Sequence, residues 1–354
     1  MTSTSKRLFL QAANGHQTTR PPIWLMRQAG RCDPAYRKFR AERDVPLENL
    51  FRDPEAAAYI SLLPARWGVD AIIIFQDILT PLSGMGAPFV FRPGPQPEQP
   101  LTSPADFMGL HQFDMAEGLP FLVSLYDILR DALKSSELPI IGFAGAPFTL
   151  LAFLAENGSP PADLPNTRAL LQEHPAAMRR FLDTLAAMTT DYLLFQISLG
   201  AETVQLFEST AHCLHPEEYA TWALPYQQQV FDGIRHTGVP SIFFARRNDA
   251  HISPATLQQA GASVLSLSSA YSLAATRATL GVETPLQGNL DNQLLANGPV
   301  DAILRAAQRC IEEGECRGHI FNLGHGVLPH TPFEHVKQLV AHVRAYEKPG
   351  VSPG

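Results

Sequence analysis

Residues 175–210, PAAMRRFLDTLAAMTTDYLLFQISLGAETVQLFEST, hold the helix and strand that decide the fold. Between Pro175 and Leu199, apolar side chains recur every three or four residues, which is the period of a helix with one buried face. Pro175 suits a first helical turn, and Gly200 suits the position just past the last turn. Thr203–Phe207 then has the length and composition of a buried strand. The stretch is therefore predicted to be one helix–strand unit.

The same alternation extends over the whole chain. Further helical patterns lie between Pro299 and Glu313 and between Pro332 and Tyr346. Alternating strands and helices favour a parallel sheet. Eight units without a midpoint favour a closed (β/α)₈ TIM barrel over an open sheet. We predict a single α/β domain over residues 1–354, with flexible ends at about 1–20 and 347–354. The eight candidate strands are Ile23–Met26, Ala71–Phe75, Ile140–Ala144, Thr203–Phe207, Ser241–Ala245, Ser263–Leu267, Thr284–Gln287 and His319–Asn322.

Composition limits the class of protein. Apolar residues make up 45% and charged residues 17% of the 354 residues, which allows a sizeable core and excludes disorder of the whole chain. The net charge of −7 argues against a nucleic-acid binder and against a binder of acidic membranes. Four scattered cysteines without a CxxC pair suit reduced thiols. No signal peptide or membrane-length apolar run is evident, so we expect a cytoplasmic protein.

Candidate functional side chains follow the predicted strands, where a barrel of this type places its chemistry. Arg27 and Arg31 follow the first strand in MRQAGR, Asp77 follows the second in FQDIL, and His325 follows the eighth in NLGHG. Each has a structural alternative. Paired arginines are often solvated, an aspartate after a strand is often a turn former or helix cap, and a single histidine is often structural.

The residue types at these positions indicate a ligand chemistry. Paired guanidinium groups bind carboxylates through forked hydrogen bonds. A carboxylate near them suits a ligand with several N–H donors or a developing positive charge. The sequence has no phosphate loop, dinucleotide-binding glycine motif, HExxH or GxSxG motif, and no close-spaced set of zinc ligands. We therefore expect a substrate with many carboxylates around a nitrogen-bearing core, and neither a cofactor nor a metal.

Five motifs together resemble one family. MRQAGR, GFAGAPFT, FES, QGNLD and FNLGHG-x-LP-x-TP-x-E-x-V occur in the order and spacing of the uroporphyrinogen decarboxylase family, from about Pro22 to Val343. The resemblance implies a single TIM barrel, a homodimer and no cofactor. It also implies removal of carbon dioxide from the four acetate side chains of uroporphyrinogen III, which gives coproporphyrinogen III in heme biosynthesis.

The resemblance also implies roles for individual residues. Arg27 and Arg31 would bind substrate carboxylates, and one of them is a proposed proton donor. Asp77 would accept hydrogen bonds from the pyrrole N–H groups. Ser209 and His325 match the remaining polar positions of the family's cleft. Phe153 stands at the cleft position where the family has a tyrosine.

This chain departs from the family pattern at several places, which puts substrate affinity and rate in doubt more than the fold. Phe153 lacks the tyrosine hydroxyl, and Asp33 would weaken carboxylate binding if its side chain pointed into the cleft. The other departures are Phe148 for tryptophan, Cys32 for an aromatic residue, Ser266–Ser269 for GLDW, Asn292 for proline and His212 for glycine.

Two other classes of protein remain open from the sequence. Cobamide-dependent methyltransferases share this barrel and have a His-x-Cys zinc pair near the end of the fifth strand. Here SIFFARR has neither histidine nor cysteine at Phe244–Arg246. A non-catalytic tetrapyrrole-binding relative is suggested by Phe153 and Asp33, although all five polar residues of the cleft motif are present.

Overall fold

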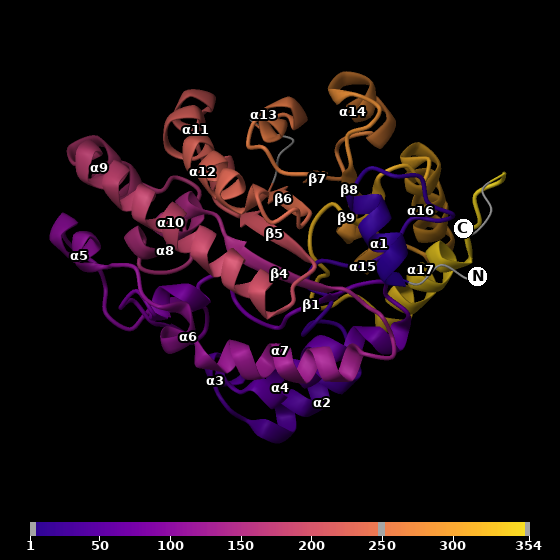
Figure 1. Ribbon diagram of the computed structural model, residues 1–354, viewed down its shortest axis with the longest axis horizontal. Coiled ribbons are helices and arrows are strands. Elements are labelled where there is room, and N and C mark those ends of the chain that lie inside the picture. The colour runs from indigo at the N-terminus through magenta and orange to yellow at the C-terminus, as the bar shows by residue number, and fades with distance from the viewer. Residues whose placement is uncertain (1–4, 247–251, 351–354) are drawn as a thin grey trace.

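The computed structural model describes residues 5–246 and 252–350, and its central sheet has seven parallel strands. The strands are ordered along the sheet as they are along the chain, and helices cover the outside (Figure 1). The predicted TIM-barrel class is confirmed by this topology. The strands are β1 (Ile72–Ile73), β4 (Ile140–Gly145), β5 (Thr203–Glu208), β6 (Ser241–Ala245), β7 (Val264–Ser266), β8 (Leu286–Leu290) and β9 (His319–Leu323).

The predicted first strand, Ile23–Met26, is present only as an isolated bridge between Ile23 and Phe321 of β9. Its extended backbone lies between the two edges of the sheet. On one side it meets β9 through this bridge, and on the other the carbonyl oxygen of Ile23 accepts a hydrogen bond from Asp70 N, just before β1, at 2.7 Å. The ladder stops there for a local reason. The amide of Met26 donates to the side chain of Asn322 at 2.9 Å, so a side chain replaces the backbone partner. The central sheet therefore has seven strands where the sequence predicts eight.

The helices follow the prediction more closely. The helix predicted between Pro175 and Leu199 is α10 (Pro175–Leu199), and Gly200 ends it in a left-handed conformation at φ 117°. The other two predicted helices are α16 (Val300–Gly314) and α17 (Phe333–Ala345). The other helices are α1 (Ser5–Ala13), α2 (Pro34–Arg43), α3 (Leu47–Arg52), α4 (Pro54–Leu62), α5 (Pro104–Gly109), α6 (Met115–Gly118), α7 (Pro120–Leu133), α8 (Pro147–Ala155), α9 (Pro165–Glu173), α11 (Pro216–Trp222), α12 (Leu224–Arg235), α13 (Pro254–Gln258), α14 (Leu273–Leu280) and α15 (Asn292–Asn297). Three 3₁₀ turns are η1 (Leu63–Trp67), η2 (Thr80–Ser83) and η3 (Ala211–Cys213).

A hairpin between β1 and α7 was not predicted. Its antiparallel strands are β2 (Phe89–Phe91) and β3 (Pro95–Pro97), and they form a separate two-stranded sheet. Two of the three residues of β3 are prolines, which lack the N–H that a ladder uses. A proline-rich stretch is typical of a loop, so the sequence hides this element.

Polar side chains fill part of the barrel interior. The indole N–H of Trp24 donates to Gln287 Oε1 at 2.9 Å, and Gln287 Nε2 donates to Gln205 Oε1 at 3.1 Å and to Ser266 Oγ at 3.0 Å. All four side chains are buried. Buried polar groups that satisfy one another fix a unique arrangement. Ser266, one of the departures from the family pattern, therefore belongs to the interior below the cleft.

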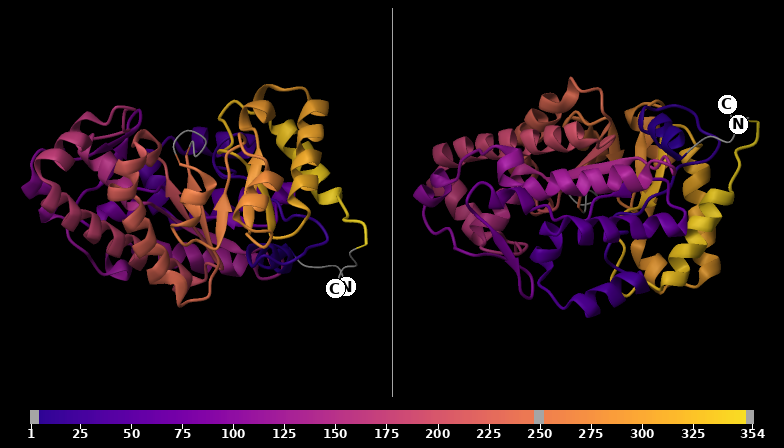
Figure 2. Two further views of the ribbon diagram at one scale, coloured as in Figure 1. Left: turned by 90° about the horizontal axis from the view of Figure 1, so that it is seen from above. Right: turned by 60° about the horizontal axis from the view of Figure 1, so that its bottom comes forward.

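The two ends of the chain lie on the same side of the molecule. Helix α1 and the segment after α17 are close together in all views (Figures 1 and 2). Lys348 N donates to Thr19 O at 2.8 Å, and Arg20 forms an ion pair with the buried Asp70 at 2.6 Å. These contacts join the segments before the first strand and after α17 to the barrel, and flexibility at about 1–20 and 347–354 stays a prediction. No helix in the described part of the chain is long and apolar enough to cross a membrane.

Candidate active site

The structure places the sequence-predicted polar residues at the carboxyl end of the sheet. Arg27 and Arg31 follow the segment that lies between β9 and β1, and Asp77 follows β1. Ser209 directly follows β5, and His325 lies two residues past β9. Phe153 lies in α8, the helix that follows β4, with its side chain half-buried.

Arg27 is held in a tight turn against the loop that carries His325. Its backbone has φ 62°, a conformation that costs a non-glycine residue about 1 kcal/mol or more. Val327 N donates to Met26 O at 2.9 Å and so ties the two loops together. The side chain runs along Gly326, where a Cβ atom would come within 2.6 Å of Arg27 Cδ. Only glycine leaves room there for the guanidinium stem.

The two arginines form the positive side of the site. Burial lowers the pKa of Arg27 to about 10, with a further lowering by Arg31 and an opposing effect of Asp77. Burial also lowers the pKa of Arg31. Both guanidinium groups carry their positive charge at neutral pH, as arginine side chains do in proteins generally. Neither forms an ion pair with a carboxylate in the described part of the chain. They are available to bind anions.

Asp77 is the carboxylate of this site. Leu79 N donates to its Oδ1 at 2.9 Å, and its own N–H donates to Thr80 Oγ1 at 3.2 Å. These bonds form a turn, and turn formation is the structural role that an aspartate after a strand often has. Burial raises the pKa of Asp77 to about 6, against the lowering effects of the Leu79 N–H and of Arg27. The group is therefore mostly ionised at neutral pH and lies close to a cation.

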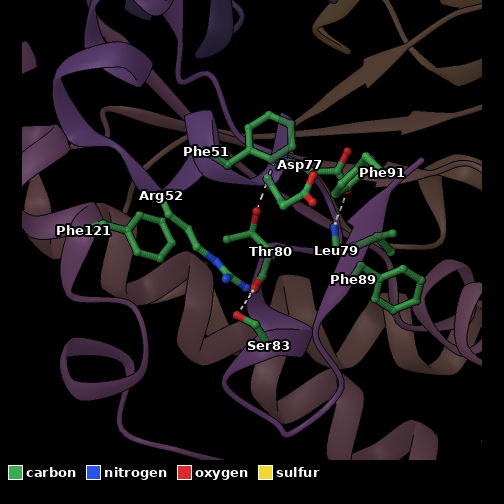
Figure 3. Close-up of a pocket in the computed structure, with 10 residues that line it drawn as sticks. Phe51, Arg52, Asp77, Leu79, Thr80, Ser83, Phe89, Phe91 and Phe121 are labelled. Carbon is green, nitrogen blue, oxygen red and sulfur yellow. Dashed lines mark hydrogen bonds between the residues drawn. The ribbon is translucent and has the colours of Figure 1, made fainter. Parts of the chain in front are cut away.

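A pocket that is partly open to solvent lies beside Asp77 (Figure 3). It lies where α3, η2, the β2–β3 hairpin and the start of α7 meet, and four of its ten lining residues are phenylalanines. The sequence analysis missed it because its wall comes from the unpredicted hairpin and a short helix. Besides Asp77, the lining residues are Glu48, Phe51, Arg52, Leu79, Thr80, Ser83, Phe89, Phe91 and Phe121.

Aromatic rings from β4, β5 and β6 also meet near the carboxyl end of the sheet. Phe143 and Phe207 meet edge to face with centroids 5.5 Å apart, and Phe207 and Phe244 do so at 5.6 Å. Phe244 in turn contacts the ring of His325 at 5.7 Å. Phe207 and His325 are partly exposed. These rings present an apolar surface that suits a large ring-shaped ligand.

His325 is neutral at physiological pH. Gly326 N donates to its Nδ1 at 2.8 Å, which assigns the ring proton to Nε2. Burial lowers the pKa of His325 to about 4, and the neighbouring charges of Arg27, Arg246, Arg31 and His212 lower it further. His325 therefore contributes a hydrogen-bonding group to the site and no positive charge.

Ser209 is positioned by a buried carboxylate that sequence analysis did not single out. Ser209 N donates to Thr149 Oγ1 at 2.8 Å, and that hydroxyl donates in turn to Glu208. Glu208 also accepts from the amides of Thr210 and Ala211 at 3.1 and 3.0 Å. The position of Ser209 thus depends on Glu208. The FES motif gave no sign of this, because Glu208 points into the core.

Several departures from the family pattern have structural explanations. Asp33 is buried and caps α2 through Ala35 N at 2.7 Å, and it accepts from Trp67 Nε1 at 3.0 Å, so its acceptors are already used. Burial raises the pKa of the Cys32 thiol to about 11, which keeps that thiol unreactive. Asn292 donates to Gly326 O at 2.9 Å and so supports the loop that carries His325.

The fold and the site define a TIM-barrel protein with cations, one carboxylate and aromatic rings at the carboxyl end of its strands. The family model for uroporphyrinogen decarboxylase (URO-D) matches residues 4–346, and this chain belongs to that family. The chain is 39% identical over 337 residues to uroporphyrinogen decarboxylase of Thermus thermophilus, which covers 94% of this chain and 96% of that one. It is 37% identical over 352 residues to uroporphyrinogen decarboxylase of Chloroflexus aurantiacus, covering 98% and 97%.

Solved structures confirm the barrel fold. A methyltransferase from Methanosarcina mazei superposes with a TM-score of 0.80 at 19% sequence identity, covering 96% of this chain and 98% of that one. A likeness at this identity shows the fold alone. Among residues 5–246 and 252–350, no cluster of three or more His, Cys, Asp or Glu side chains could hold a metal ion.

Proposed function

We propose that the protein is a carboxy-lyase that converts uroporphyrinogen III into coproporphyrinogen III in porphyrin and heme biosynthesis. The observation that carries this proposal is Asp77, a carboxylate close to the positive charge of Arg27 at the mouth of the barrel. Relatives that match nearly the whole chain carry the name of this enzyme, which supports the same conclusion.

The reaction needs an electron sink, which the substrate itself provides. A proton adds to a ring carbon of one pyrrole, and the pyrrole becomes a cation. The bond between the acetate CH₂ and its carboxylate then breaks, carbon dioxide leaves, and the electron pair forms a double bond to the ring. A proton adds to the exocyclic CH₂, and loss of the first proton restores the pyrrole. Each acetate thus becomes a methyl group with net uptake of one proton.

The residues of the site suit this sequence of steps. Asp77 accepts hydrogen bonds from the pyrrole N–H groups. Its fixed negative charge, in a site that excludes water, stabilises the pyrrole cation as it develops. Arg27 and Arg31 bind carboxylates of the substrate and orient the flexible polyanion, so part of the rate enhancement comes from positioning. Ser209 and His325 add hydrogen bonds, and Phe153 contributes apolar contact without the hydroxyl of a tyrosine.

An oxygen-free incubation of the purified protein with uroporphyrinogen III tests the proposal. The products are oxidised and separated by their number of carboxyl groups. We expect seven-, six-, five- and four-carboxyl porphyrins to appear in turn. Unchanged eight-carboxyl material from folded protein would contradict the decarboxylase proposal. If that protein still bound the porphyrin, the non-catalytic tetrapyrrole-binding alternative, which the missing hydroxyl at Phe153 favours, would replace it.

We also propose a single domain that acts as a cytoplasmic homodimer without cofactor, metal or nucleic acid. The family match over residues 4–346 supports the single domain, and the net charge of −7 fits a protein with a small-molecule substrate. Cys32, Cys310 and Cys316 are free thiols, which suits a reducing compartment. Light scattering after size-exclusion chromatography tests the dimer, since a monomer has 38.8 kDa.

A further inference from the structure

Strand β6 places a third arginine at the mouth of the barrel. Arg246 directly follows β6, and its N–H donates to Glu208 O at 2.8 Å, one bond beyond the pairing of Glu208 with Ala245. The backbone of Arg246 is therefore fixed next to Ser209. From the sequence alone, the segment SIFFARR is informative only because it lacks the His-x-Cys zinc pair of cobamide-dependent methyltransferases.

The side chain of Arg246 faces the site. Side chains alternate along a strand, and the bond to Glu208 O continues the ladder to Arg246, so Arg246 lies on the same side as Phe244. The ring of Phe244 contacts His325 at 5.7 Å. The charge of Arg246 lowers the pKa of both Arg27 and His325, which agrees with this direction.

Within the part of the chain that the structure describes, the positive charge of Arg246 has no carboxylate partner. The side chain is exposed and forms no ion pair with a carboxylate in residues 5–246 and 252–350. Arg27 and Arg31 likewise form none, so three guanidinium groups face a cleft whose nearby carboxylate is Asp77. Like charges held together in this way repel one another, and binding of several anions relieves that repulsion.

We propose that Arg246 is a substrate-binding residue that holds a side-chain carboxylate of the tetrapyrrole on the β6 side of the cleft, separate from the carboxylates held by Arg27 and Arg31. This inference rests on the proposed function. A substrate with eight carboxylates spread around a ring needs cations on more than one side of the cleft. Arg27 and Arg31 both follow the extended segment 23–26, which lies beside β9 and β1, so they supply cations on one side only. A guanidinium is suited to the role because it binds a carboxylate through two parallel hydrogen bonds.

Binding of uroporphyrin III, the oxidised and unreactive form of the substrate, tests this role without turnover. We expect Arg246→Gln to weaken its binding about tenfold or more, the usual effect of losing a charge-assisted hydrogen bond. Arg246→Lys keeps the charge and is expected to lie between Gln and wild type. Arg180→Gln is the matched control, because it removes an exposed arginine on α10, outside the cleft. A dissociation constant for Arg246→Gln within twofold of wild type at low salt would overturn the inference.

Kinetics separate this inference from the proposed function. With uroporphyrinogen III, Arg246→Gln is expected to raise KM about tenfold with kcat within a few-fold of wild type. An equal loss in kcat with unchanged KM would contradict a binding role. If wild-type protein binds uroporphyrin III but does not turn over uroporphyrinogen III, the proposed function fails, while weaker porphyrin binding by Arg246→Gln still supports Arg246 as a binding residue.

Discussion

The ends of β1 and β5 each carry a carboxylate whose pKa is raised by burial, yet the two are used differently. Asp77, after β1, accepts one hydrogen bond in the described part of the chain, from Leu79 N at 2.9 Å. Glu208, the last residue of β5, is surrounded by donors. These are Thr149 Oγ1, Thr210 N, Ala211 N and Gln227 Nε2.

The difference in hydrogen bonding separates the roles of the two groups. A buried carboxylate whose acceptor sites are filled by the protein holds the surrounding backbone in place and has little capacity left for a ligand. The partners of Glu208 are themselves fixed, since Gln227 Oε1 accepts from the hydroxyl of Tyr219 at 2.6 Å. Asp77 keeps open acceptor sites beside a pocket and a cation. We infer that Glu208 builds the cleft and that Asp77 acts on the substrate.

The largest expected effect is on the activity of Asp77→Asn. Asparagine keeps the acceptor for Leu79 N but removes the charge that stabilises a pyrrole cation. We expect kcat/KM for uroporphyrinogen III to fall by about 10²–10³, the usual cost of losing such a group. Asp127→Asn, which removes an exposed carboxylate on α7, is the control. A loss of less than about fivefold for Asp77→Asn would show that the two carboxylates do not differ as inferred.

The next effect is on folding. Glu208→Ala leaves several buried donors without an acceptor, so we expect the free energy of unfolding to fall by about 3 kcal/mol. Glu217→Ala, at an exposed position on α11, is expected to change it by no more than about 0.5 kcal/mol. Urea unfolding curves measure both. An unchanged unfolding midpoint for Glu208→Ala would show that Glu208 does not hold the surrounding backbone in place.

The difference in stability between wild type and Asp77→Asn depends on pH, and the raised pKa of Asp77 sets its direction. Because the folded protein holds the Asp77 proton more tightly than the unfolded chain, wild type gains stability from this group at low pH. That gain is lost as the pH rises through about 6. We therefore expect Asp77→Asn to be more stable than wild type by about 1–3 kcal/mol near pH 8, and equally stable near pH 4. A destabilised variant near pH 8 would contradict the burial of this charge.

The smallest expected effect is that of Phe153→Tyr. The change adds a hydroxyl at the half-buried position where the family has a tyrosine. One added hydrogen bond to substrate is expected to raise kcat/KM by about threefold, in line with about 0.5–1 kcal/mol. Phe148→Tyr is the contrasting variant, because Phe148 is fully buried and a hydroxyl there is expected to cost stability. An unchanged kcat/KM for Phe153→Tyr would place this side chain away from the substrate.

The sequence predicted the fold where local patterns and tertiary packing agree. The span of α10 was predicted to the residue because proline, periodic apolar side chains and Gly200 all mark it. The segment at Ile23–Met26 was predicted as a strand because it is apolar. It forms only a bridge, since Asn322 and other side chains take its amides. The competing side chain of Asn322 comes from a residue almost 300 positions away.

The candidate site was predicted only in part, for a related reason. Arg27, Asp77, Ser209 and His325 could be picked out because they directly follow predicted strands or match family motifs. Arg246 also ends a strand, but its relation to the site depends on the direction of its side chain. The pocket depends on a hairpin with proline in its second strand. Contacts between elements far apart in the chain leave no local signal.

The pH dependence of kcat/KM in the wild-type protein tests the central claim most directly, namely that Asp77 acts as an ionised carboxylate. We predict that kcat/KM for uroporphyrinogen III falls tenfold per pH unit below about pH 6, as Asp77 takes up a proton. The residual activity of Asp77→Asn is predicted to lack this limb, which separates Asp77 from the carboxylates of the substrate. A wild-type profile that stays flat down to about pH 5, or the same limb in Asp77→Asn, would contradict the account.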